Sequence, residues 1–127
     1  MTTNLVELAA TANALVAPAK GILAADESTG TIAKRLESIN VENTETARRA
    51  YREMLFRTEG AANYVSGVIL FDETLRQAAA DETPMVNLLT DQGIIPGIKV
   101  DTGAKPLAGG ANGELVTEGL DGLRERL

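Results

Sequence analysis

Three short runs of apolar residues, each ended by charged side chains, constrain this chain more than any other feature of its sequence. The runs cover residues 21–25, 65–71 and 94–100, and the segments between them carry helical patterns. Each run is too short for a helix of its own, so each predicts a buried strand. Strands that alternate with helices form parallel sheets covered on both faces, joined by right-handed crossovers. We therefore expect an α/β fold with the order β-α-β-α-β.

Local signals predict where the helices lie. Asn4 and Glu7 have the spacing of a capping box, which predicts that a helix begins at residue 5 and ends before Pro18. Further helices are expected over residues 31–39, 44–56, 72–77 and 85–91. The apolar side of helix 44–56 is formed by Ala47, Ala50, Tyr51, Met54 and Leu55. After Pro106, repeated glycines predict loops or a hairpin, followed from Gly122 by the first turn of a helix.

Two architectures fit this order of elements: an open doubly wound sheet, and part of a (β/α)8 TIM barrel. A complete barrel needs about 250 residues and eight strands, whereas this chain has 127 residues. In the barrel interpretation, residues 1–127 are the N-terminal segment of a single barrel domain. That segment is an incomplete barrel of about three parallel strands with their helices.

Charged side chains follow all three predicted strands, at the edge where parallel α/β folds bind ligands. Because side chains alternate along a strand, Asp26 continues the face of Ile22 and Ala24, and Lys99 continues the face of Gly97. We therefore expect that Asp26 and Lys99 can meet in a barrel mouth, where this pair suits proton transfer or anion capture. The alternative is that Asp26 caps the following helix and that Lys99 is an ordinary surface charge.

A candidate phosphate site begins two residues after Asp26. Ser28 and Thr31 lead into a helix that carries Lys34 and Arg35 one turn later. Hydroxyls, free backbone N–H groups and nearby cations together suit a phosphate group. The alternative is that Ser28 or Thr29 is an ordinary N-cap.

Two other charged groups have simpler interpretations. The first is a basic stripe, in which the spacing of Glu45–Arg49 and Glu53–Arg57 predicts ion pairs on a solvated helix. We interpret this stripe as structural, with Arg48 as its exception; its members are Arg48, Arg49, Arg52 and Arg57. The second group, residues 72–73, offers two acids that suit a general base, but we favour a capping role for them.

Composition excludes several classes of function. Cys and His are absent, which removes disulfides, thiolate or imidazole metal sites, and catalytic triads built on these residues. Twelve basic residues against eighteen acidic ones give a net charge of −6, which argues against binding nucleic acid through its phosphates. No segment has the roughly 20 apolar residues that cross a bilayer, and no targeting segment is evident. We therefore expect a cytoplasmic protein without a membrane partner.

Most of the sequence resembles the class I fructose-1,6-bisphosphate aldolases. The most extended match is residues 20–36, KGILAADESTGTIAKRL, which is similar to the first barrel strand of that family and the loop after it. The match continues in the same order and spacing over residues 42–45, 67–75, 96–101, 106–109 and 119–123. The resemblance covers nearly all of the chain and implies a (β/α)8 barrel.

The resemblance also implies an activity. Members of this family are usually homotetramers that reversibly cleave fructose 1,6-bisphosphate into dihydroxyacetone phosphate and glyceraldehyde 3-phosphate, a step of glycolysis. They use no metal or other cofactor. A lysine forms a Schiff base with the substrate ketone, and the protonated imine accepts electrons when the carbon–carbon bond breaks.

The resemblance assigns roles to six residues. Asp26 matches the active-site aspartate that positions or deprotonates the reacting hydroxyls, and Lys99 matches a lysine that contacts the substrate and its distal phosphate. Ser28 and Thr31 match hydroxyl positions near that phosphate, although the second is more often serine in the family. The remaining matches are arginines associated with substrate binding, at Arg35 and Arg48.

The family's Schiff-base lysine and acid–base glutamates lie on later strands. None of the four lysines here corresponds to the nucleophile; they are Lys20, Lys34, Lys99 and Lys105. We therefore expect the isolated chain to be inactive. The alternative function is a non-catalytic half-barrel that binds sugar phosphates or associates through its unpaired strand edges.

Overall fold

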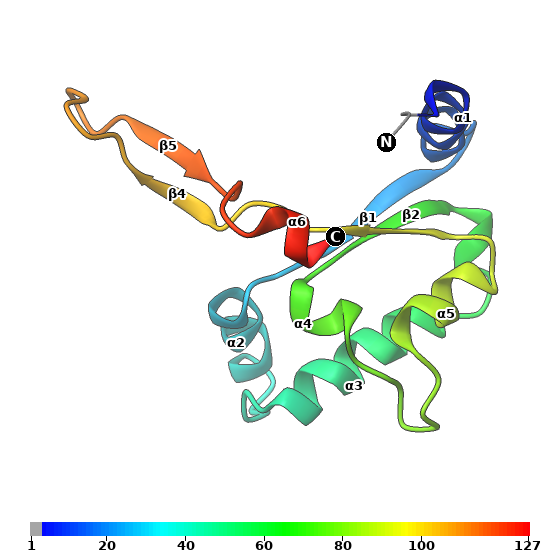
Figure 1. The fold of residues 1–127 in the computed structure, drawn as a ribbon. Helices are drawn as coiled ribbons and strands as arrows, with labels where there is room; N and C mark the ends of the chain where they lie inside the picture. Colours follow the sequence, from blue (N-terminus) through cyan, green and yellow to red (C-terminus); the bar gives the residue numbers. More distant parts are fainter. Residues whose placement is uncertain (1–3) are drawn as a thin grey trace.

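The computed structural model describes residues 4–127 and has a three-stranded parallel sheet at its centre (Figure 1). The strands pair in the order β1-β2-β3 and are β1 (Gly21–Ala25), β2 (Val65–Leu70) and β3 (Ile95–Ile98). Four helices connect or follow them: α2 (Thr29–Glu37), α3 (Glu45–Phe56), α4 (Asp72–Leu75) and α5 (Met85–Thr90). A 3-10 turn, η1 (Ala61–Asn63), precedes β2. The predicted β-α-β-α-β order is confirmed.

Helix α1 (Leu5–Leu15) begins at its predicted cap and packs by its last turn against β2. Asn4 Oδ1 accepts a hydrogen bond from the backbone N–H of Glu7 at 3.3 Å. The Ser66 hydroxyl donates to the Leu15 carbonyl at 2.6 Å. A Cβ atom at Gly67 would lie 2.5 Å from Cδ2 of Leu15 and 3.2 Å from the Ile95 carbonyl oxygen, so glycine allows this close packing.

The glycine-rich segment forms the hairpin that the sequence predicts. Strands β4 (Gly103–Pro106) and β5 (Leu115–Glu118) pair antiparallel, and the short helix α6 (Leu123–Arg126) follows. The hairpin projects from the end of β3, while α6 returns to the strand ends (Figure 1). Residues far apart in the sequence thereby meet beside β3.

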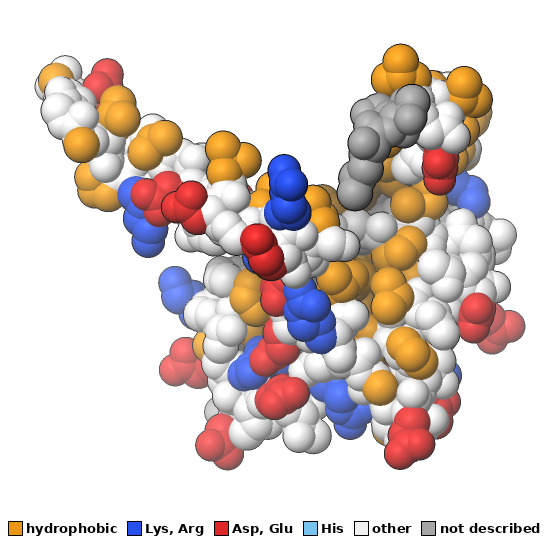
Figure 2. Space-filling view, in the orientation of Figure 1, with side chains coloured by type: hydrophobic (Ala, Val, Ile, Leu, Met, Phe, Trp, Pro, Cys, Tyr) orange, Lys and Arg blue, Asp and Glu red, His pale blue; other side chains and the backbone are white. Residues whose placement is uncertain are grey.

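The helices α2 to α5 lie on one side of the sheet (Figure 1). A doubly wound sheet has helices on both faces, whereas a barrel has its helices outside and its strands in sequential order. The expectation of a sheet covered on both faces, with β1 buried, is wrong: Ile22 on the opposite face is 49% exposed. Figure 2 shows hydrophobic side chains in the hollow between α1 and the hairpin, which is the open face of a partial barrel.

The core lies between the sheet and helices α3 and α5. Its largest apolar members include Phe56, Val68, Leu70, Met85 and Leu89. Helix α3 buries the side that its sequence predicts only in part: Leu55 packs against the core, whereas Met54 is 60% exposed. The buried residues of α3 are instead Arg48, Arg52 and Phe56, at successive i,i+4 positions. The two buried guanidiniums face carboxylates from other elements, which offsets part of the cost of their lost hydration.

Candidate active site at the strand ends

The carboxyl ends of β1 and β3 bring Asp26 and Lys99 together. Ala24 pairs with Ile69 of β2, and Ile69 pairs with Gly97 of β3. Asp26 and Lys99 each lie two residues further along, so both side chains extend from the same face of the sheet. The Lys99 Nζ atom lies 3.5 Å from Asp26 Oδ2, which confirms that the two residues meet. Asp26 is not the N-cap of α2, because Ser28 holds that position.

Lys99 makes its shortest contact with Asp101, a residue outside the predicted site. The Nζ atom donates to Asp101 Oδ2 at 2.6 Å, and the Gly103 backbone N–H donates to Asp101 Oδ1 at 3.0 Å. The hydrogen bond with Asp101 raises the pKa of Lys99, and nearby Asp26 adds to this effect. The same hydrogen bond lowers the pKa of Asp101. Lys99 is therefore held as an ammonium between two carboxylates.

A cavity of about 570 Å³ opens beside this pair. Its walls come from all three strand ends and from the C-terminal segment: Ser28, Phe71, Asp72, Lys99, Asp101, Thr102, Gly103, Asp121 and Arg126. Arg126 was not predicted, because its partners lie far away in sequence. Its Nη2 atom donates to the Lys99 carbonyl at 2.7 Å, and its Nη1 atom donates to the Val100 carbonyl at 3.1 Å.

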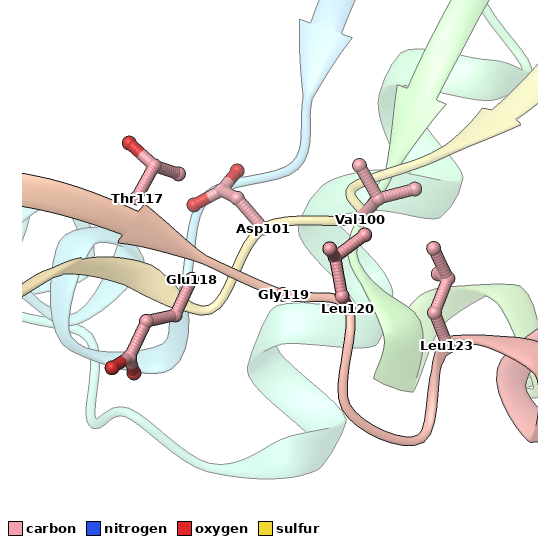
Figure 3. A pocket seen from close by; sticks show the side chains of 7 residues that line it. All are labelled: Val100, Asp101, Thr117, Glu118, Gly119, Leu120 and Leu123. Atoms are coloured by element: carbon pink, nitrogen blue, oxygen red, sulfur yellow. The ribbon is translucent and has the colours of Figure 1, made fainter.

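A smaller cavity of about 180 Å³ lies between the end of β3 and the hairpin. It is lined by Val100, Asp101, Thr117, Glu118, Gly119, Leu120 and Leu123, and the side chain of Leu120 extends toward Val100 (Figure 3). The side chain of Glu118 points away from this group in the same view (Figure 3). The mostly apolar lining suits packing of the hairpin against the strand end better than binding of a charged ligand.

The two hydroxyls of the predicted phosphate site lie side by side at the start of α2. Ser28 Oγ is 3.1 Å from Thr31 Oγ1, and both residues are exposed. Ser28 is the N-cap residue by backbone geometry, but its side chain makes no capping hydrogen bond. Its hydroxyl thus contacts Thr31 instead of capping the helix, and Ser28 also lines the larger cavity.

Arg35 and Arg48 lie further from the cavity. Arg35 pairs with Glu27 and donates to the Tyr51 hydroxyl at 3.3 Å, with 55% of its side chain exposed. Arg48 is buried and holds both carboxylate oxygens of Glu73, at 2.8 Å from Nε and 2.6 Å from Nη2. This hydrogen bonding lowers the pKa of Glu73. Lys34 is exposed on α2.

The sequence predicts only some of the ion pairs that the remaining charged side chains form. Arg57 pairs with Glu53 at 3.0 Å, as expected. Arg49 also pairs with Glu53, at 2.8 Å, and not with Glu45 as predicted. The capping role predicted for Asp72 and Glu73 is wrong, because Phe71 is the N-cap of α4 and no side chain caps that helix. The two acids instead bind arginines: Arg76 and Arg126 contact Asp72, and Arg48 contacts Glu73.

Arg52 was expected on a solvated stripe, yet its side chain is fully buried. Its Nη2 atom donates to the Glu27 carbonyl at 2.6 Å. Sequence periodicity gives one signal that could have found it: Arg48, Arg52 and Phe56 share a helix face. A buried apolar residue at the end of that face indicates that the arginines before it are also turned inward.

Residues 4–127 contain neither a cluster of metal ligands nor a helix that could span a membrane. No group of three or more metal-ligating Asp, Glu, His or Cys side chains occurs in this part of the chain. None of the helices described here has the length and apolar character needed to span a membrane.

Parallel strands in sequential order, helices on one side, and charged groups at the carboxyl ends define part of a (β/α)8-barrel enzyme. The family profile described as "Glycolytic: Fructose-bisphosphate aldolase class-I" matches residues 7–127. The chain therefore belongs to the class I fructose-bisphosphate aldolase family.

Individual relatives agree with this assignment. The "Probable fructose-bisphosphate aldolase class 1" of Xanthomonas campestris pv. campestris is 63% identical over 121 residues, which are 95% of this chain and 36% of the relative. The cytosolic fructose-bisphosphate aldolase 6 of Arabidopsis thaliana is 62% identical over 120 residues, 94% of this chain and 33% of the relative. The chain thus spans about a third of the length of these curated relatives.

A solved structure gives the same result for the fold. Fructose-bisphosphate aldolase from Plasmodium falciparum, in complex with TRAP and a small-molecule inhibitor, superposes with a TM-score of 0.91 at 54% identity. The match covers 95% of this chain and 35% of that one. The predicted incomplete barrel is therefore confirmed over the doubly wound alternative.

Proposed function

We propose that this chain forms the N-terminal segment of a single aldolase barrel domain and one side of its active site. The reaction is the reversible cleavage of fructose 1,6-bisphosphate into dihydroxyacetone phosphate and glyceraldehyde 3-phosphate. The observation that carries the proposal is the 3.5 Å contact between Lys99 and Asp26, beside a cavity of about 570 Å³. A cation, a carboxylate and a hydroxyl at one mouth suit a phosphorylated polyol.

Each residue at this mouth has its own role in substrate binding. Lys99 binds a phosphate oxygen of the substrate, and Ser28 and Thr31 donate hydroxyl hydrogen bonds to the same phosphate. Asp26 accepts a hydrogen bond from a substrate hydroxyl and orients or deprotonates it. Arg35 contributes positive charge from the second turn of α2.

Arg48 contributes to substrate binding through the strand-end segment that it holds. Its two hydrogen bonds to Glu73 fix the first turn of α4. That turn follows Phe71, which lines the larger cavity. The rigid pair therefore maintains the wall on which the substrate rests.

Lys99 does not form the Schiff base in this proposal. A lysine must lose its proton before its amine can attack a ketone. The hydrogen bond to Asp101 raises the pKa of Lys99 and keeps it protonated, which suits anion binding and opposes nucleophilic attack. As the family resemblance implies, the imine-forming lysine lies in the part of the family's length that this chain does not span, and we expect the chain alone to be inactive.

The names of relatives support a cellular location for this function. Related aldolases of Arabidopsis thaliana and Spinacia oleracea are named as cytosolic or cytoplasmic isozymes. We place the same activity in the cytoplasm, where the sugar phosphate is the partner. Assembly of the complete enzyme is as a homotetramer, as the family resemblance implies.

Borohydride trapping tests the proposal directly. The purified chain is mixed with dihydroxyacetone phosphate, reduced with borohydride and examined by intact mass, with an aldol-cleavage assay in parallel. We expect no adduct and no cleavage. A stoichiometric adduct would show that a lysine of this chain is the nucleophile.

Grafting and titration test whether the chain supports cleavage within a complete enzyme and whether it binds the substrate. Replacing the corresponding residues of the Xanthomonas campestris relative with this chain should give an enzyme that cleaves fructose 1,6-bisphosphate. Calorimetric titration of the chain itself with that sugar should detect binding, which Asp26→Ala weakens. Binding without any activity in the grafted enzyme would favour the non-catalytic module instead.

A further inference from the structure

The buried guanidinium of Arg52 lies directly behind the strand ends that carry the site. Its Nη2 atom donates to the carbonyl oxygen of Glu27 at 2.6 Å, and its charged centre lies 5.6 Å from the centre of the Phe71 ring. Glu27 follows β1, and Phe71 follows β2 and lines the larger cavity. One side chain of α3 therefore touches the backs of two neighbouring strand ends.

The contact with Glu27 has a direct consequence for the site. Glu27 lies between Asp26 and Ser28, so fixing its carbonyl fixes the peptide plane that joins it to Ser28. A hydrogen bond from a buried cation to a carbonyl is stronger than one between neutral groups. The orientation of the Asp26–Ser28 segment thus depends on a group that does not reach the cavity.

The other surroundings of Arg52 are poorly suited to a purely stabilising role. Its distances to the carboxylates of Glu27 and Glu73 are both 3.8 Å, too long for hydrogen bonds. Within residues 4–127, Arg52 Nε and Nη1 have no hydrogen-bond partner. Glu27 is also paired with Arg35, and Glu73 with Arg48, so replacing Arg52 leaves neither carboxylate without a cationic partner.

We propose that Arg52 is a positioning residue: it holds the Glu27 carbonyl so that Asp26 and Ser28 are aimed at the phosphorylated substrate. This inference rests on the proposed function and extends it to a residue outside the substrate contacts. Arg52 acts through the Asp26–Ser28 segment and on the Phe71 wall, without touching the substrate.

Two substitutions and a matched control test this role in the full 127-residue chain. Arg52→Met keeps an unbranched, flexible apolar side chain and removes the donors. Arg52→Lys keeps a cation with a single donating group, which cannot reproduce the planar fork of the guanidinium. Arg49→Met removes an arginine from the same helix that pairs with Glu53 at 2.8 Å, away from the strand ends.

The readouts separate positioning from stability. NMR order parameters and amide hydrogen exchange of residues 26–32 report local order, and the same measurements in β2 report the core. Calorimetric titration with fructose 1,6-bisphosphate reports binding. We expect Arg52→Met to loosen residues 26–32, leave β2 unchanged, and weaken binding about tenfold. Arg52→Lys should show a smaller loss of both, and Arg49→Met should match the unaltered chain.

Each outcome decides the proposal. A folded Arg52→Met variant with the local order and affinity of the Arg49→Met control would overturn it. If Arg52→Met does not fold, Arg52→Lys decides alone: loosening confined to residues 26–32 supports the proposal, and unchanged order overturns it. Failure of the unaltered chain to bind the sugar would count against the proposed function. The order measurements would still test whether the hydrogen bond from Arg52 fixes the Glu27 carbonyl.

Discussion

The ammonium of Lys99 lies 3.5 Å from the carboxylate of Asp26, across the sheet from the end of β3 to the end of β1. Strand β2 lies between these two strands, so the contact needs both side chains to extend over the same face. The pair therefore joins the two outer strands of the sheet at the edge where the loops converge. Lys99 supplies the cation of this charge pattern for an anionic ligand, and Arg126 lines the same cavity.

Replacing this cation is the simplest test of the charge pattern. Lys99→Met should weaken binding of fructose 1,6-bisphosphate at least about tenfold, because a phosphate loses a charge-assisted hydrogen bond. The fold should persist, since a quarter of the Lys99 side chain is exposed (25%) and methionine keeps its apolar stem. Calorimetric titration measures the affinity. Lys105→Met, on the exposed strand β4, is the control, and equal affinities of the two variants would contradict the role of Lys99.

The sequence predicts this contact because two simple regularities decide it. Side chains alternate along a strand, and parallel strands end at a common edge, so Asp26 and Lys99 follow from counting residues. The same reasoning gives the order of the strands and helices. The start of α1 also follows from sequence, because the cap at Asn4 uses atoms only three residues apart.

The environment of α3 does not follow from sequence, because it depends on partners from distant segments. Arg52 is buried beside Glu27 of one strand end and Glu73 of another, and no local pattern encodes that meeting. The side of α3 with more apolar residues is therefore only partly buried, and the fully buried side is the one with the arginines. Arg126 was missed for the same reason, since its acceptors are carbonyls at the end of β3.

The pair of Arg48 and Glu73 should contribute strongly to stability. Arg48→Ala removes two hydrogen bonds to Glu73, of 2.8 and 2.6 Å, and another to Asn43 Oδ1 at 3.0 Å, and it leaves a half-buried carboxylate without its main partner. We expect the free energy of unfolding to fall by about 3 kcal/mol. In a double-mutant cycle with Glu73→Gln, measured by urea denaturation, the coupling energy should exceed about 1 kcal/mol. Additive single effects would show that the two side chains act independently.

Glu73 should also make stability depend on pH. Arg48 lowers the pKa of Glu73 below its ordinary value of 4.5 in the folded chain. A depressed carboxylate pKa contributes stability that is complete above the unfolded pKa and is lost as pH falls through the folded pKa. Unfolding free energy, measured by urea titration at several pH values, should therefore decrease below about pH 4.5. Glu73→Gln should reduce that slope.

Asp81 provides a control with a distinct pH window. Hydrogen bonds from Thr83 and Arg57 lower its pKa from 3.8 to about 2, so its contribution disappears only between these values. Asp81→Asn should leave the slope near pH 4.5 unchanged and flatten the curve at lower pH. If the two variants had identical pH profiles, the assignment of the upper window to Glu73 would be wrong.

Gly119 should be essential for the position of the hairpin. A Cβ atom there would lie 2.5 Å from the Val100 carbonyl oxygen and 2.8 Å from the Asp101 Cα, and neither backbone atom can rotate away. Gly119→Ala should therefore displace β5 and destabilise the chain by more than about 1 kcal/mol. Gly21→Ala, where a Cβ meets no atom within 4 Å, is the control. Urea denaturation and amide exchange in β4 and β5 measure the two effects, and equal stability of the variants would contradict the close approach.

Asp101 should limit anion binding while it orients Lys99. Its carboxylate lies 2.6 Å from Lys99 Nζ, closer than Asp26, and so takes one of the three N–H donors that the ammonium could offer to a phosphate oxygen. Asp101→Asn removes one negative charge from the cavity and weakens the competing hydrogen bond. Lys99 stays an ammonium, because lysine far from this partner still has a pKa well above neutrality.

We expect Asp101→Asn to bind inorganic phosphate several-fold more tightly than the unaltered chain at low ionic strength, and the difference should shrink as salt screens the charges. Calorimetric titration at two salt concentrations measures both effects. Asp121→Asn is a matched control, because Asp121 lines the same cavity but is exposed. Equal gains in the two variants would indicate a general charge effect, whereas a gain confined to Asp101→Asn would show that Asp101 competes with the anion for Lys99.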